Sequence, residues 1–190
     1  DQDGNIWIAS FRETSGTPSK IVVYEDGNPK KFDSFQHPDL TSPFDIAIDA
    51  SGDAWVSYQS GGPRDQGGIG HFSFNAKDGI NLIQTISSRE LNVPFGIATA
   101  SDGSVWVANN GGSPRYKSRT VSRIDPITGA VETFTINSSR KSGPWGINLD
   151  GANNVYVANF EALSISVLNG SSVDSLYGHE PGTALSPEGG

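Results

Sequence analysis

A short pattern built around an aromatic residue with apolar neighbours occurs four times in this sequence. Its clearest copy is Asp102–Asn109 (DGSVWVAN), and the other three copies are Asp3–Ser10 (DGNIWIAS), Gly52–Tyr58 (GDAWVSY) and Asn153–Asn159 (NNVYVAN). The aromatic residues follow one another after 48, 51 and 50 residues and are Trp7, Trp55, Trp106 and Tyr156. A repeat of about this length is typical of β-propeller blades.

A second pattern precedes three of these segments. Pro43, Pro94 and Pro144 each lie 12 residues before the aromatic residue, and each opens a short apolar run. We interpret this run as the innermost strand of a blade, since proline is tolerated at the first residue of a strand. Gly, Asp and Asn between the run and the aromatic segment predict a tight turn, so the two strands form an antiparallel hairpin.

Two further strands follow in each repeat. The predicted third strands are 21–24, 69–74, 121–124 and 164–168, and the predicted fourth strands are 31–35, 82–86, 131–136 and 173–177. Four strands per repeat is the blade of a propeller. With 23 Gly and 11 Pro and no long helical periodicity, the sequence predicts an all-β fold: a β-propeller of four-stranded antiparallel blades with four repeats present.

The predicted blades divide the chain into one propeller segment. They span approximately 1–38, 39–89, 90–139 and 140–182, and 183–190 resembles the opening of another inner strand. The first blade is incomplete because its inner strand is missing. Either a C-terminal segment closes a four-bladed ring, or the chain is a segment of a larger propeller of about six to eight blades, and we favour the second interpretation.

Composition excludes several classes of function. The net charge is −8, which disfavours nucleic acid as a partner. We expect neither a membrane span nor a signal peptide, because no long apolar run and no charged segment followed by an apolar one is present. The absence of cysteine excludes disulfides, thiolate metal sites and cysteine nucleophiles.

The two repeated patterns together resemble those of NHL and streptogramin-lyase-like propellers, and more distantly of the SMP-30/gluconolactonase group. The resemblance covers the whole chain. Resemblance to the lyases implies metal-dependent elimination with a histidine beside the inner-strand proline, but the residues there are Phe44, Phe95 and Trp145. Resemblance to the lactonases implies a divalent cation in the central channel, for which Asn109, Asn148 and Asn159 are partial counterparts.

Phe44, Phe95 and Trp145 are the main candidates for ligand binding. They begin the inner strands, so they can form an aromatic rim at the channel mouth that stacks on a sugar ring or grips a peptide side chain. Packing against the neighbouring blade is the alternative interpretation. Tyr58 and the amides Asn109 and Asn159 end the second strands on that same face, where they either contact a ligand or satisfy turn backbone.

Two loops between second and third strands share a Gly-Gly-(Ser)-Pro-Arg core. They contain Arg64 and Arg115. Long glycine-rich loops on a rigid scaffold often bind ligands, and these arginines can engage a carboxylate, a sulfate or an acidic partner. The alternative is a solvated surface loop.

The sequence contains no pattern that assigns catalytic residues, a metal site or a cofactor. His37, His71 and His179 are scattered without metal-ligand spacing, so an imidazole metal site is not predicted, and no nucleophile elbow or P-loop is present. A divalent cation enters only under the lactonase or lyase interpretation.

We therefore expect a non-catalytic module of an extracytoplasmic protein, whether secreted, periplasmic or on the cell surface. Its loop-rich face would bind a protein, a small molecule or a carbohydrate. One alternative is a metal-dependent lyase or lactonase whose missing ligands lie outside this segment. The other is a structural or assembly module that self-associates through open blade edges.

Overall fold

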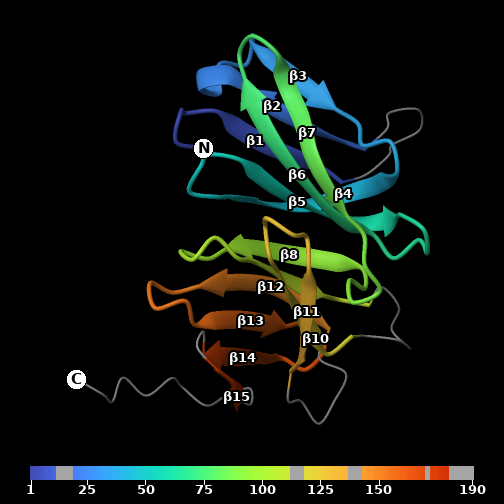
Figure 1. Ribbon diagram of the computed structural model, residues 1–190, viewed down its shortest axis with the longest axis vertical. Helices are drawn as coiled ribbons and strands as arrows, with labels where there is room; N and C mark the ends of the chain where they lie inside the picture. The colour runs from blue at the N-terminus through green and yellow to red at the C-terminus, as the bar shows by residue number, and fades with distance from the viewer. Residues whose placement is uncertain (12–18, 112–117, 137–142, 170–171, 180–190) are drawn as a thin grey trace.

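The protein consists of four antiparallel sheets that follow one another along the chain (Figure 1). In this computed structural model the described residues are 1–11, 19–111, 118–136, 143–169 and 172–179, with 169 and 172–179 described by their backbone alone. Among them the only helix is the single 3-10 turn η1 (Glu25–Gly27). No helix of the described chain combines the length and apolarity that crossing a membrane requires.

Each sheet is a meander in which sequence neighbours pair. The first sheet has three strands: β1 (Ile6–Ser10), β2 (Lys20–Tyr24) and β3 (Phe32–Phe35). The second has β4 (Leu40–Ile48), β5 (Ala54–Gly61), β6 (Gly68–Asn75) and β7 (Gly79–Ile86). The third has β8 (Pro94–Thr99), β9 (Val105–Asn109), β10 (Thr120–Ile124) and β11 (Val131–Thr135). The fourth has β12 (Pro144–Leu149), β13 (Val155–Asn159), β14 (Ser164–Asn169) and β15 (Ser172–His179).

The arrangement confirms the predicted succession of propeller blades. The first strand β8 packs against β4 on one side and β12 on the other, as successive blades around a common axis require (Figure 1). Every predicted third and fourth strand is present, and the first sheet contains three strands, as expected for an incomplete first blade.

β7 begins at Gly79, three residues before its predicted start, and one inner strand also differs from its prediction. β8 and β12 begin at their prolines, whereas β4 begins three residues before Pro43, at Leu40. The reason is that β5 runs on to Gly61, so Leu40 pairs with Gly61 and Thr41 with Ser60. Pro43 therefore lies inside a strand, next to the irregular backbone of Ser42 with its φ of 60°.

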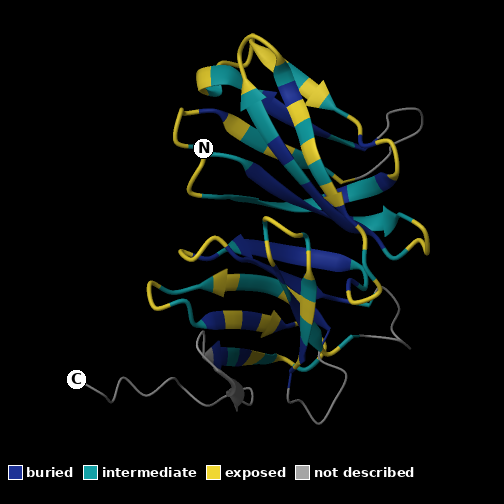
Figure 2. Cartoon of the chain, viewed as in Figure 1, coloured by how far each residue is buried: buried dark blue, intermediate teal, exposed yellow. Residues whose placement is uncertain are grey.

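In the part of the chain that the structure describes, the hydrophobic core forms three clusters, one between each pair of neighbouring sheets. Trp55 and Trp106 lie at equivalent positions in two of them, and both are buried. Trp7 packs against the third. Figure 2 shows the consequence, because β8, which lies between two sheets, is buried along almost its whole length.

Tyr156 is the exception among the repeated aromatic residues. It occupies the same repeat position as Trp55, yet 41% of its surface is exposed. Among the described residues, the third sheet packs on one face of the fourth, and no sheet covers the other face, where the Tyr156 ring lies. The predicted packing role therefore holds for Trp55 and Trp106, but is incomplete for Tyr156.

His37 joins the first two sheets from the connection between β3 and β4. It is buried, and its Nδ1 accepts hydrogen bonds from the backbone N–H groups of Asp39 and Leu40, both at 3.0 Å. Because Nδ1 accepts, the ring proton lies on Nε2, which is 2.9 Å from Thr85 Oγ1 in β7. Burial lowers the pKa of His37, and the carboxylate of Asp39 opposes this only in part.

We expect His37 to make stability depend on pH. Its folded-state pKa lies below the ordinary value of 6.5, so the unfolded chain takes up the proton first as the pH falls. The free energy of unfolding should therefore be highest above about pH 6.5 and decrease below it. Urea unfolding between about pH 7.5 and pH 5 measures this decrease.

The control is His37→Gln, which removes the titrating group. The pKa of His71 is also lowered by burial, so both proteins should lose some stability on acidification. The wild type should lose more unfolding free energy than His37→Gln between about pH 7.5 and pH 5. The prediction is wrong if the two proteins lose the same amount.

Candidate functional site

The inner strands share an irregularity at the residues that the sequence analysis selected. In β4, β8 and β12 the pairing register shifts directly after Pro43, Pro94 and Pro144. The residues that fall in these bulges include Phe44, Phe95 and Trp145. A bulge changes the direction of a side chain relative to the regular pleat, so three blades turn an aromatic ring in the same way.

These rings form one cluster across three sheets. Phe44 and Phe95 have centroids 4.5 Å apart, and Trp145 lies 4.7 Å from Phe95 and 5.9 Å from Phe44. Phe11 lies 5.6 Å from Phe44, and Phe160 lies 5.1 Å from Trp145. We call these five residues the inner aromatic cluster. The predicted convergence of the inner-strand aromatics is therefore present in the structure.

Burial divides the cluster into a base and a rim. Phe95, in the middle, is only 8% exposed, and Phe44 is half-buried. Trp145 is 40% exposed and Phe160 58%, with Phe11 at 37%. Since Phe95 is held between its neighbours, it supports the exposed rings and has little surface of its own to offer a ligand.

Phe11 and Phe160 were not predicted from the sequence, although a signal was present. Each lies four residues after the repeated aromatic residue, directly beyond the end of a second strand. The corresponding residues in the other two repeats are Gln59 and Asn110, so the aromatic character is not itself periodic. The contacts of Phe11 with Phe44 and of Phe160 with Trp145 are visible only in the tertiary structure.

The residues that end the second strands lie at the same end of the blades but are buried. Pro43 pairs with Tyr58, Pro94 with Asn109 and Pro144 with Asn159, which confirms their predicted proximity to the inner-strand aromatics.

The two asparagines are held by their own blades. Asn109 is fully buried, and its Nδ2 donates to Ser122 Oγ at 2.8 Å and Thr120 Oγ1 at 3.2 Å. Its Oδ1 accepts from the backbone N–H of Asn92. Asn159 Nδ2 donates to Ser166 Oγ at 2.8 Å in the same manner. The amides therefore join strands within a blade and do not face the rim.

Tyr58 is also part of the interior. It belongs to the cluster between the first two sheets, its ring lies 5.4 Å from that of His37, and burial raises the pKa of its hydroxyl. Its Oη has no hydrogen-bond partner among the described residues. Like the asparagines, Tyr58 supports the aromatic face from beneath.

Arg64 lies in the loop between β5 and β6, on the same face as the inner aromatic cluster. The backbone N–H of Val93, two residues before Phe95, donates to Gln66 O at 2.8 Å and so fixes this loop beside the start of β8. Arg64 and Arg89 are both exposed and line one small pocket, together with Pro63, Gln66, Gly67, Ser87 and Ser88. Arg115 lies outside the described residues.

Asp45 is a further polar residue of the inner strands, in β4, that was not predicted from the sequence. It stands where the other inner strands have Gly96 and Gly146. Its Oδ2 accepts from the backbone N–H of Ile97 in β8 at 3.1 Å, while Ser57 Oγ, beside it, donates to Phe95 O. These bonds tie the second blade to the third below the aromatic cluster.

Comparison with known proteins identifies the fold. The chain matches no protein-family model, and no curated protein sequence matches it significantly. A catalytically inactive virginiamycin B lyase from Staphylococcus aureus, solved with quinupristin, superimposes with a TM-score of 0.69 at 18% identity, over 96% of this chain and 54% of that one. A streptogramin B lyase gives 0.68 at 18% identity, over 96% and 53%. The WD40 propeller domain of Doa1 gives 0.62 at 12% identity, over 87% and 47%.

The chain has a β-propeller fold. The predicted resemblance to streptogramin-lyase-like propeller repeats is confirmed as a likeness of fold, since the identities are between 12% and 18%. The chain spans about half the length of these solved structures.

Proposed function

We propose that this chain is a binding module whose face around the inner aromatic cluster takes up a ligand or a protein segment. The observation that supports the proposal is the exposure of Trp145 and Phe160 above a buried Phe95, at the end of the blades where the inner strands begin. Exposed aromatic rings on a rigid support give large contact area at a small cost in conformational entropy.

The surrounding charge suggests the chemistry of the ligand. Arg64 and Arg89 lie on the same face, on a molecule whose net charge is −8. A ligand with an apolar or planar ring surface and a nearby carboxylate or sulfate would satisfy both features. Acidic oligosaccharides and peptides that carry an aromatic and an acidic residue have this combination.

Trp145→Ala is the variant that tests the proposal. Arrays of acidic glycans and of aromatic-acidic peptides are probed with the wild type and the variant, and the affinity of each retained compound is then measured by titration calorimetry. Removing a central aromatic contact should weaken binding at least about tenfold. Arg64→Ala should cause a smaller loss that shrinks further as salt concentration rises.

Ile127→Ala provides the matched control. Ile127 is the most exposed large apolar side chain among the described residues, at 89%, but it lies in the turn between β10 and β11, at the opposite end of the third blade. Its replacement should leave binding unchanged. Retention by neither array, or equal binding by wild type and Trp145→Ala, would contradict the proposal.

Self-association competes with this interpretation and is measured in the same samples. β1 is an edge strand of the first sheet, and its Ile6 and Ile8 are 50% and 42% exposed. Such an edge can pair with another chain. Light scattering before and after addition of a retained compound separates the two, because a ligand that binds the aromatic face of a monomer leaves its mass unchanged.

A further inference from the structure

The turn between the first two strands of each blade begins with a carboxylate in three of the four blades. Asp1, Asp49 and Asp150 each lie six residues before the repeated aromatic residue. The Oδ1 atom of each aspartate accepts a hydrogen bond from the backbone N–H of the residue four positions later, at 2.9 to 3.1 Å. The Oδ2 atom accepts from the aromatic side chain, which is Trp Nε1 in the first two blades and Tyr Oη in the fourth.

The second blade departs from this plan at the residue four positions after the aspartate. In the first and fourth blades that residue is asparagine, and its Nδ2 donates to the turn carboxylate: Asn5 to Asp1 at 2.9 Å and Asn154 to Asp150 at 2.8 Å. In the second blade it is Asp53, which has no amide to donate. Two carboxylates, Asp49 and Asp53, therefore lie where the first and fourth blades have a hydrogen-bonded pair.

A second departure lies directly opposite on the neighbouring strand. The residue paired with the repeated aromatic is Val23 in the first blade and Val167 in the fourth, but His71 in the second. The His71 ring stacks on Trp55, with centroids 3.8 Å apart and planes 12° apart. Both changes from the repeat therefore occur in one blade and at one place.

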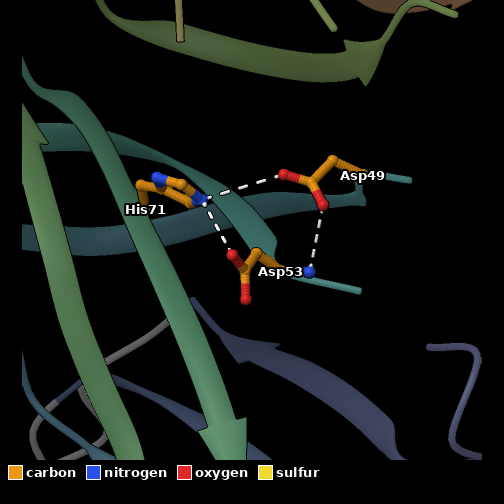
Figure 3. A group of neighbouring side chains, drawn as sticks. All are labelled: Asp49, Asp53 and His71. Atoms are coloured by element: carbon orange, nitrogen blue, oxygen red, sulfur yellow. Dashed lines mark hydrogen bonds and ion pairs between the residues drawn. The ribbon is translucent and has the colours of Figure 1, made fainter. Parts of the chain in front are cut away.

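The imidazole of His71 points between the two carboxylates (Figure 3). Its Nε2 lies 3.8 Å from Asp49 Oδ2 and 3.6 Å from Asp53 Oδ2, and both distances are too long for hydrogen bonds. The Nε2 atom is buried and has no hydrogen-bond partner among the described residues. A buried ring nitrogen without a partner is costly, so this arrangement calls for a species that contacts all three groups.

The third blade shows how a positive charge can occupy this place. There the residue opposite Trp106 is Arg123. Its Nη2 lies 3.0 Å from Oδ2 of Asp102, which lies in the equivalent turn of the third blade, between β8 and β9. The second blade has two carboxylates and no guanidinium or ammonium within ion-pair distance of either, among the described residues. It therefore lacks the cation that its third-blade counterpart supplies from the chain.

We propose that Asp49, Asp53 and His71 bind a divalent transition-metal ion, with Zn²⁺ as the best match. One imidazole nitrogen and two carboxylate oxygens are a donor set that Zn²⁺ accepts. Tetrahedral coordination with bonds of about 2.0–2.1 Å requires donor atoms about 3.3 Å apart, which the observed 3.6 and 3.8 Å approach closely. All three donor atoms lie within 4.8 Å of one another.

The surroundings favour a bound ion in two further ways. Backbone N–H groups of Ser51 and Asp53 donate to Asp49 Oδ1, and Trp55 Nε1 donates to Oδ2, so the carboxylate is held in place by outer contacts of the kind found around metal ligands. The Asp53 side chain is 28% exposed, which leaves a side open for water as the fourth ligand. The site lies at the end of the second blade opposite to Phe44, so it is separate from the proposed binding face.

Titration calorimetry with Zn²⁺ on the chelator-treated chain tests the proposal near neutral pH. We expect one ion per chain and a rise in Tm on binding. Asp53→Asn restores the residue of the first and fourth blades, and His71→Val restores their valine, so both variants keep side chains that the fold already accommodates. Each should weaken Zn²⁺ binding by more than about 100-fold, beyond the effect of losing an outer contact.

Asp102→Asn is the matched control, since it removes a turn carboxylate from the third blade and should leave Zn²⁺ binding unchanged. Ca²⁺ and Mg²⁺ should not compete, because these ions prefer oxygen ligands. Co²⁺ added to the wild type provides a readout that needs no variant: visible absorption bands of four-coordinate Co²⁺ should appear and be removed by Zn²⁺. The proposal is overturned if these bands are absent, or if Asp53→Asn and His71→Val bind Zn²⁺ as tightly as the wild type.

Discussion

Trp55→Ala is expected to lower the free energy of unfolding by about 3–5 kcal/mol, the cost typical of removing a fully buried tryptophan. Trp55 is completely buried in the cluster between the second and third sheets, where it contacts a core that includes Ile97 and Val105. Its indole also donates to Asp49 Oδ2 at 2.9 Å. The substitution would leave both a cavity between two blades and a turn carboxylate without one of its donors.

Urea unfolding followed by far-UV circular dichroism measures this loss, since the variant lacks one of the four tryptophans that a fluorescence signal would report. Tyr156→Ala is the matched control at the same repeat position. Because Tyr156 is 41% exposed, its removal should cost only about 1 kcal/mol. Equal losses in the two variants would show that Trp55 does not join the sheets as described.

Gly96→Ala is expected to cost about 1–3 kcal/mol because the inner strands β8 and β12 approach too closely for a side chain. A Cβ at Gly96 would lie 2.6 Å from Trp145 O and 2.9 Å from Ile147 N. These are backbone atoms, so relief requires the two blades to move apart. The same movement would displace Trp145 in the aromatic cluster.

Gly146→Ala makes the comparison at the equivalent position of the next blade. There an added Cβ meets only Ala158 Cβ, at 3.8 Å. Its effect should be neutral or slightly stabilising, since alanine restricts the unfolded chain more than glycine does. Thermal and urea unfolding of both variants decide the matter, and a Gly96→Ala protein as stable as Gly146→Ala would refute the close approach of the strands.

Much of the fold could be predicted because its signals are local. Short apolar runs around Trp55 and Trp106, proline before the inner strands and Gly-Asp turns each act within a few residues, and their repetition indicates the number of strands in each blade. The convergence of Phe44, Phe95 and Trp145 followed from their common phase. Their common phase did not predict that Phe95 is buried while Trp145 is exposed, because burial depends on which sheets pack on either side.

Such patterns do not predict the bulges. Nor do they predict the contacts of Asp45, which stands where the other inner strands have glycine. Proline followed by an aromatic residue marks where β8 and β12 begin and lies inside β4, but the register shift after it depends on how each inner strand meets its neighbours. Asp45 bonds to the backbone of Ile97, a residue 52 positions away in the next blade. No pattern within one repeat specifies that contact.

The group of Asp49, Asp53 and His71 shows most clearly what short-range sequence patterns do not determine. The repeat alone shows Asp53 where the first and fourth blades have asparagine, and His71 where they have valine, and both differences are visible in the amino-acid order. Their meeting depends on the register of β5 against β6, across an intervening loop, and a shift of one residue would turn His71 to the opposite face of the sheet. Short-range propensities therefore determined the blades of this protein, whereas pairing register and the packing of one blade on the next decided which of its polar and aromatic side chains came together.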